Sequence, residues 1–359
     1  MLPGRRAALI ILVVALAVLT AWQPAVAQVT NLSPAPGGIP LSNAGGGGKT
    51  WQASFGAMNA LGVGTPAPGV NVIPLSNGAL YYTRYLITVT GLGTHNAVIT
   101  GVVSNNFAHP LALVMESCPA FLACASATDF SVMSTNAAAP TTIVGAPGLP
   151  NNSVVTAGLA IFVPDNNGAG AFAGTDSARL KFTARDLTNN QTDTVELRLE
   201  NPNESLQSAL QLTLATATGG LTVNPGADFS LNFGNVNGLG IGPAPGLTTL
   251  PVAGGVIYST PYLLKPAFSG FASTTGTLSV FVSTDFVNSA ALQLNSATNS
   301  AGPYTAISKS AATATRITNA ATNRVSLTEF LGLFVSRANG PAAFAGTDSA
   351  TLTFTLTVP

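Results

Sequence analysis

The sequence predicts an all-β protein of two tandem β-sandwich domains of immunoglobulin-like size that arose by internal duplication. Two observations lead to this prediction. Segments rich in Val, Ile, Thr, Phe and Tyr alternate with clusters of Gly, Pro and Asn, and no helical period is sustained. The same residue patterns then recur in the same order 172–179 positions later. Roughly seven strands are expected per copy, which suits two packed sheets.

The strands are predicted from alternation and the duplication from matched motifs. Residues 351–358 alternate threonine with an apolar residue, which predicts a strand with one buried and one exposed face. The dipeptide Phe55-Gly56 and the Gly/Pro-rich loop after it recur from Phe233 onward. The motif Ala-Phe-Ala-Gly-Thr-Asp-Ser-Ala occupies 171–178 and again 343–350. A whole domain, rather than a short solenoid unit, is therefore repeated.

The domain boundaries follow from these matches and from changes in composition. We place the first β-sandwich repeat at 51–186 and the second at 228–359. The segment 28–50 is rich in Gly and Pro, a composition typical of flexible linkers, so we expect it to be a flexible segment.

The segment 187–227 differs from the repeats in its density of charge. Residues 195–200 and 210–214 alternate apolar and polar side chains, and Asn201-Pro202-Asn203 between them is a turn sequence. We therefore expect a charged, half-exposed β-hairpin and linker here. A short helix from Glu204 to Leu212 is the alternative.

The first 27 residues predict a secretory signal peptide. Arg5 and Arg6 precede the uncharged run 7–22, and Ala25-Val26-Ala27 supplies a small-x-small cleavage site. An N-terminal membrane anchor is the alternative, although the run is short for a bilayer. No later segment is long and apolar enough to predict a transmembrane helix in the mature chain. We expect a secreted, extracellular or cell-surface protein.

Charge excludes one class of partner. Only 7% of the residues are charged, against about 25% in an average soluble domain. Removal of residues 1–27 would leave 11 basic and 13 acidic residues with no basic stripe, so nucleic acid is not an expected partner. No cofactor-binding motif is found, and we expect no cofactor.

The two cysteines, Cys118 and Cys124, are close in sequence. In an exported chain such a couple predicts a disulfide. Two thiols are too few for a metal site, and His95 and His109 are the only histidines.

These histidines provide little material for catalysis, because Asn288 stands in the second copy where His109 stands in the first. No nucleophile or metalloprotease motif accompanies them. We expect the protein not to be an enzyme, with no catalytic and no metal-binding residues.

Asp176 and Asp348 are the acidic residues that occupy matching positions in both copies. We interpret each as a structural turn residue whose carboxylate accepts backbone N–H bonds. The alternative is a calcium site that includes Asp165, Asn166 and Asn167.

Tyrosines form the main aromatic concentration. Tyr81 and Tyr85 match Tyr258 and Tyr262, and in each pair the spacing places both rings on one face of a strand. They are candidate ligand contacts, because exposed aromatic rings stack on sugars. Packing in the core is the alternative.

The function that the sequence favours is a bacterial secreted or cell-surface structural protein, a coat, matrix or fibre component without catalytic activity. Two similar surfaces per chain suit self-association or binding to other surface proteins, through sheet edges. The alternative is an extracellular polysaccharide-binding module that uses the paired tyrosines.

Overall fold

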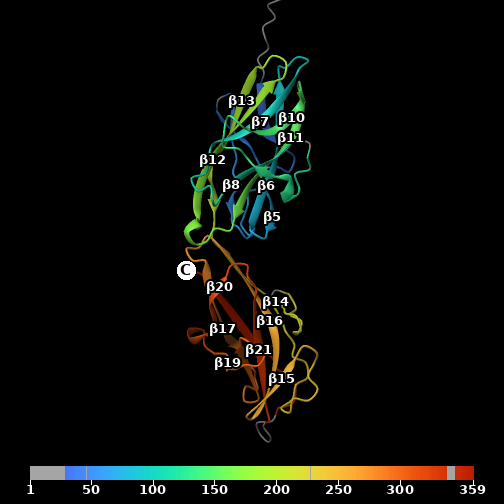
Figure 1. The fold of residues 1–359 in the computed structure, drawn as a ribbon, viewed down its shortest axis with the longest axis vertical. Helices are drawn as coiled ribbons and strands as arrows, with labels where there is room; N and C mark the ends of the chain where they lie inside the picture. The colour runs from blue at the N-terminus through green and yellow to red at the C-terminus, as the bar shows by residue number, and fades with distance from the viewer. Residues whose placement is uncertain (1–28, 46, 121, 227, 338–343) are drawn as a thin grey trace, which may run out of the picture.

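The computed structural model describes residues 29–45, 47–120, 122–226, 228–337 and 344–359. The chain forms two halves, residues 29–206 and 209–359, that lie end to end along the long axis (Figure 1). The described residues are all-β, with three short 3-10 turns at Ala127–Asp129, Gly168–Gly170 and Ala311–Thr313 and no α-helix. One large hydrophobic core lies in each half. The predicted signal peptide, 1–27, lies outside the described residues.

Two antiparallel-rich sheets enclose the core of the first half. The first sheet has the order β1 (Val29–Pro34), β6 (Gly78–Thr90), β11 (Val154–Pro164), β8 (Val114–Cys118) and β9 (Ser131–Val132), with β5 (Asn71–Leu75) also paired to β6. The second has the order β10 (Thr141–Pro150), β7 (Asn96–Asn105), β12 (Gly174–Asp186), β13 (Thr192–Leu206), β3 (Thr50–Gln52) and β2 (Ser42–Gly45), with β4 (Ala57–Met58) also paired to β13.

The second half also has two sheets. The larger one has the same strand order as the first sheet of the first half, and the smaller one has only three strands. Its larger sheet has the order β14 (Ala209–Thr216), β16 (Gly255–Ser269), β21 (Leu327–Ser336), β18 (Leu292–Ala297) and β19 (Thr305–Ala306), with β15 (Thr248–Val252) paired to β16. The smaller sheet contains β20 (Thr315–Thr322), β17 (Thr275–Thr284) and β22 (Thr351–Thr357). Strands equivalent to β13, β3 and β2 are not found among the described residues of this sheet.

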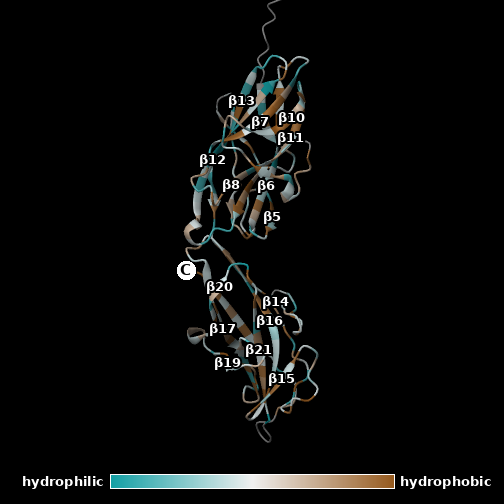
Figure 2. Cartoon of the chain, in the orientation of Figure 1, coloured by the Kyte–Doolittle hydropathy of each residue, from teal (hydrophilic) through white to brown (hydrophobic). Residues whose placement is uncertain are grey.

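Alternation explains which faces of the strands are buried. In β12 and β13 the apolar residues Leu180, Phe182, Val195 and Leu197 face the core and are at most 1% exposed, while charged residues alternate with them on the outer face. Figure 2 shows this as hydrophilic colouring along β12 and β13 of the first half. The period of two in the sequence therefore determines which face of each strand is buried.

The segment 28–50 is not the flexible segment that composition predicts. From residue 29 it supplies β1, which pairs with β6 along its whole length, and then β2 and the start of β3. Leu32 and Ile39 are almost fully buried. Glycines here serve turns at positive φ, as at Gly37 with φ of 70°, so their abundance reflects turn geometry and not disorder.

The predicted hairpin within 187–227 is also wrong, and so is its helical alternative. Both segments are strands, but β13 pairs with β12, β3 and β4, whereas β14 pairs with β16 of the second half. The Asn201-Pro202-Asn203 sequence lies at an irregularity inside β13, so it does not reverse the chain. The alternation was interpreted correctly for each strand, but it carries no information about the partner strand.

A buried acid lies at the end of β13. Glu204 is fully buried, and its Oε2 accepts a hydrogen bond of 2.8 Å from the Phe55 N–H. Its Oε1 has no partner within the described part of the chain. Burial raises the pKa of Glu204 from 4.5 to about 8, because the Phe55 N–H and the Ser54 side chain offset only part of the cost of desolvation.

Because this pKa is raised on folding, its contribution to stability is complete below the ordinary value of 4.5 and is lost as the pH rises to about 8. We expect Glu204→Gln, which keeps the acceptor for Phe55, to reduce the fall in melting temperature over this range. Circular dichroism melts at several pH values would measure it. Glu196→Gln, which alters a partly exposed carboxylate of the same strand, should retain the wild-type slope. Equal slopes for the wild type and Glu204→Gln would contradict a raised pKa.

Candidate functional site

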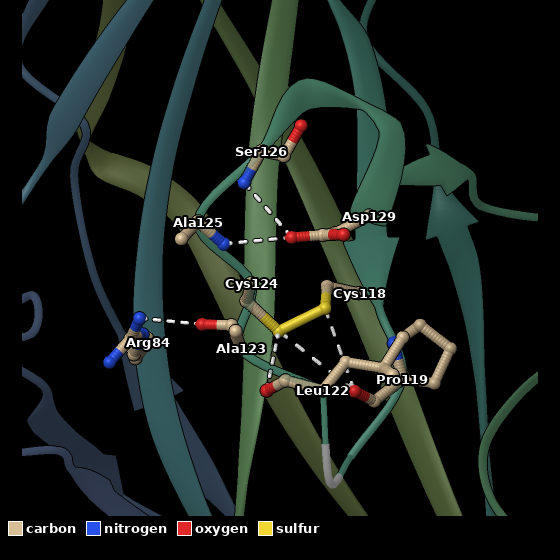
Figure 3. Close-up of a disulfide and its surroundings, with 9 residues drawn as sticks. All are labelled: Arg84, Cys118, Pro119, Leu122, Ala123, Cys124, Ala125, Ser126 and Asp129. Carbon is tan, nitrogen blue, oxygen red and sulfur yellow. Dashed lines mark hydrogen bonds between the residues drawn. A yellow bond between two sulfur atoms is a disulfide. The ribbon is translucent and has the colours of Figure 1, made fainter.

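The predicted disulfide between Cys118 and Cys124 is present (Figure 3). It closes a loop after β8, with the two Cα atoms 5.8 Å apart, and both residues are buried. Gly158 on the neighbouring β11 makes room for it, because a Cβ there would lie 2.8 Å from the Cys118 Cβ. A buried disulfide is typical of extracellular and cell-surface proteins, in agreement with the expected location.

The same loop is held by polar contacts on both sides of the disulfide. Arg84 donates to the Ala123 carbonyl at 2.5 Å, and the Asp129 Oδ2 accepts the N–H groups of Ala125 and Ser126 at 2.9 Å (Figure 3). These two N–H bonds lower the pKa of Asp129. Every polar contact shown here fixes the loop, so we assign it a structural role.

The four candidate ligand-contact tyrosines are core residues. Tyr81, Tyr85, Tyr258 and Tyr262 are between 0% and 3% exposed, so the prediction that they contact a ligand is wrong. The spacing correctly placed each pair on one face of a strand, but that face of β6 and of β16 is covered by the opposing sheet. The polysaccharide hypothesis loses the residues on which it rested.

One tyrosine of each pair anchors the loop that precedes it. The Tyr81 hydroxyl donates to the Asn59 carbonyl and accepts the Asn59 N–H, both at 2.9 Å. The Tyr258 hydroxyl makes the same two bonds with Asn237, at 2.8 and 3.0 Å. In contrast, the buried Tyr85 hydroxyl has no partner among the described residues.

We expect Tyr81→Phe to lower the free energy of unfolding by about 1–3 kcal/mol, because it leaves the buried Asn59 N–H unpaired, while the Asn59 carbonyl keeps its bond from the Gly62 N–H. Tyr85→Phe is the matched control. It removes a hydroxyl without a partner and should be neutral or slightly stabilising. Urea unfolding followed by circular dichroism would measure both. Similar losses for the two variants would show that the Tyr85 hydroxyl is hydrogen-bonded.

Asp176 and Asp348 both hold turns, as the sequence indicates. The Asp176 carboxylate accepts the N–H groups of Ala108, His109 and Ser177 at 2.7–3.0 Å. Asp348 accepts those of Val287, Asn288 and Ser349 at 2.8–3.2 Å. Burial opposes ionisation of Asp176, but these bonds and the His109 ring outweigh it, so its pKa lies below the usual range. For Asp348 the Asn288 N–H is the main cause of a lowered pKa.

Each histidine forms a pair with an aspartate. The Nδ1 atoms of His95 and His109 lie 3.0 Å from carboxylate oxygens of Asp186 and Asp176 respectively. His109 also stacks on Phe172, with ring centroids 3.6 Å apart. A catalytic triad would need a nucleophile at the other ring nitrogen, and within the described ranges no Ser, Thr or Cys side chain hydrogen-bonds either ring. In the same ranges, no group of three metal-ligating side chains is found.

The residues of the calcium alternative instead join the two halves. Asp165 accepts two hydrogen bonds from the Arg324 guanidinium, at 2.6 and 3.1 Å. The same guanidinium donates to the Ala60 carbonyl at 3.0 Å. Such two-pronged Arg–carboxylate contacts fix orientation as well as distance. An arginine inserted at this carboxylate opposes cation binding, which argues against the calcium site.

Backbone hydrogen bonds between the halves extend the contact of Asp165 with Arg324, and together they form the joint between the two halves. The Asn166 carbonyl accepts the Gly270 N–H at 3.0 Å, and the Gly168 N–H donates to the Phe271 carbonyl at 2.9 Å. The Asn167 side chain donates to the Phe268 carbonyl and accepts the Phe271 N–H. The joint therefore combines an ion pair with a short backbone ladder, a geometry that resists rotation of one half against the other.

We expect Arg324→Ala to let the two halves reorient while each keeps its own fold. NMR relaxation should then give different rotational correlation times for the two halves, where the wild type gives one. Arg324→Lys should behave in an intermediate way, because an ammonium cannot contact both carboxylate oxygens as a planar guanidinium does. Arg316→Ala, at an exposed site on β20, serves as the control. Unchanged correlation times in Arg324→Ala would show that the backbone bonds suffice.

The open edge of β22 is the candidate interaction site. On one side β22 pairs with β17, and no described strand pairs with its other side. In the first half the corresponding strand, β12, is covered on both sides by β7 and β13. Unpaired strand edges present a row of free N–H and C=O groups, and they are the usual sites of strand addition.

The core beside this edge is incompletely covered. Leu180 and Phe182 of β12 are fully buried, whereas their counterparts Leu352 and Phe354 of β22 are only half-buried. Many more partly buried apolar residues line the core of the second half than that of the first. Sequence alternation identified 351–358 as a strand, but it could not show that one side of this strand has no partner.

Comparisons with known proteins give no family. No family model and no curated protein matches the chain. The chain is similar to the CupB6 tip adhesin of Pseudomonas aeruginosa, at 10% identity over 92% of this chain and 96% of that one, with a TM-score of 0.29. It is also similar to a structure of the chaperone–tip adhesin complex of CFA/I fimbriae biogenesis, at 13% identity over 94% and 86%, with a TM-score of 0.21.

A third similarity covers less of the chain. A family 123 glycoside hydrolase from Clostridium perfringens matches at 8% identity and a TM-score of 0.24, over 50% of this chain and 27% of the enzyme. At these identities and TM-scores the similarities carry no functional argument. Within the described residues, no helix is long and apolar enough to span a membrane. Function is therefore inferred from the molecule's own surfaces.

Proposed function

We propose that this protein is a secreted or cell-surface structural protein, an assembly component of a coat, matrix or fibre, without catalytic activity. The observation that carries the proposal is the open edge of β22 beside an incompletely covered core. An exposed apolar edge of this kind favours association with another polypeptide. The disulfide, the weak charge of the chain and its extended outline support a role outside the cell.

We propose further that the chain consists of two copies of one sandwich domain, with revised boundaries of 29–206 and 209–359. Matched contacts support this division. The Tyr81–Asn59 and Tyr258–Asn237 pairs are alike, and so are the turns held by Asp176 and Asp348. The pairing of β1 with β6 and of β14 with β16 supports a start for each copy that is earlier than the sequence motifs indicate.

The mass of purified 28–359 in solution, measured by light scattering over a concentration series, tests the assembly role. We expect the average mass to rise with concentration. The double variant Thr353→Lys/Thr355→Lys should suppress this rise, because lysines on the facing edges of two copies would repel one another. Both side chains are exposed, so the fold should tolerate them. Asn319→Lys, on β20 at the opposite side of the same sheet, is the matched control. A constant monomer mass at every concentration would count against self-assembly.

A further inference from the structure

The first half shows what the open edge of the second half lacks. There, β13 lies between β12 on one side and β3 and β4 on the other, antiparallel to β12 and parallel to β3 and β4. Its backbone bonds to both neighbours, for example through the Glu196 N–H to the Lys49 carbonyl at 2.8 Å. Removal of β13 from this sheet would leave two facing strand edges and an open core between them.

The second half contains one of these edges, β22, which is the counterpart of β12. The counterpart of the other edge is the segment 229–236, which lies outside the named strands and contains Phe233, the sequence match of Phe55. Phe55 is fully buried, whereas Phe233 is half-buried and Phe229 on the same segment is 39% exposed. No described strand of the second half pairs with β22 at the position that β13 fills beside β12 in the first half, and we refer to this unfilled position as the slot.

The side chains of β13, which fills this position in the first half, indicate which residues would fit in the slot of the second half. β13 places Val195, Leu197 and Leu199 into the core, each at most 1% exposed. These residues lie opposite Phe182, Leu180 and Ala178 of β12. The matching positions are Phe354 and Leu352 of β22 and Ala350 directly before it, all partly exposed and all in contact with the core of the second half.

The charged side chains of β13, unlike its apolar ones, have no matching partners on β22. Glu196 lies opposite Lys181 in the first half, but the matching position of β22 is Thr353. The residues from Ser349 to Pro359 include no charged side chain. The slot therefore selects for apolar residues at alternate positions and is indifferent to charge between them.

We propose that the second half binds an extended strand of another polypeptide in this slot, antiparallel to β22, with three apolar side chains at alternate positions opposite Ala350, Leu352 and Phe354. This inference deepens the proposed assembly function by naming the kind of partner that the open edge accepts. Backbone hydrogen bonds to β22 supply affinity, and burial of the three side chains supplies selectivity.

The test uses the one strand known to fit such a slot. A fluorescently labelled peptide of residues 192–206 is titrated with the purified protein, residues 28–359, and its fluorescence anisotropy is recorded. We expect saturable binding of one peptide per chain. A control peptide with Val195→Ser, Leu197→Ser and Leu199→Ser should bind at least about tenfold more weakly, since three buried apolar contacts are lost.

A variant with a permanent occupant gives the second arm. A copy of residues 187–206 is added after Pro359, so that it can fold back along β22 as the same segment follows β12 in the first half. We expect this variant to lose peptide binding and to melt at a higher temperature than the wild type. A version of the addition with the same three serine substitutions should do neither.

Two results would overturn the proposal. Equal binding of the two peptides would show that the slot does not select alternating apolar residues, and no binding of either peptide to the wild type would show that the slot is closed. A wild-type dimer that the peptide fails to displace and that Thr353→Lys/Thr355→Lys dissociates would identify a second copy of β22 as the occupant instead.

These outcomes are separable from those of the mass measurement. Peptide binding by a protein that stays monomeric would support the slot and reject self-assembly. Concentration-dependent assembly without peptide binding would support an assembly role and reject the slot.

Discussion

Strand β13 is the element on which the organisation of the whole chain depends. It completes the second sheet of the first half by pairing with β12, β3 and β4, and it covers the core with three fully buried apolar residues. The larger sheet of the second half has the same strand order as the first sheet of the first half, but no described strand pairs with the free side of β22. The smaller sheet of the second half has three strands where the first half has seven, and the core beside β22 is therefore less completely covered.

The contacts between the halves fix the position of the open edge of β22 relative to the first half. Asp165 and Arg324 form a two-pronged ion pair, and Asn166 and Gly168 extend it with backbone bonds. The Pro359 carbonyl accepts the Ser273 N–H at 3.1 Å. The C-terminal end of the chain lies between the two halves, near the joint (Figure 1). The open edge of β22 therefore runs from the joint along the second half. A strand bound there would lie beside the second half, with one end close to the first.

The candidate site was only partly visible in the sequence. The Thr/apolar alternation of 351–358 predicted the strand and its buried face, and matched motifs predicted that Asp176 and Asp348 serve equivalent turns. The tyrosines were misassigned because spacing shows that two rings share a face, not whether another sheet covers that face. Arg324 was missed altogether, since no local pattern indicates that a side chain contacts a carboxylate 159 residues away.

The sequence alone determined the strand content, the duplicated motifs, the close-spaced disulfide and the inward side of each alternating segment, because these are properties of residue type and short-range period. The tertiary structure decided which edges are paired. It made 29–34 a core strand, separated β13 from β14, and left one side of β22 open. The physical reason is that a strand's hydrogen-bonding groups are the same whatever its side chains, so its partner is chosen by long-range packing and not by the local sequence.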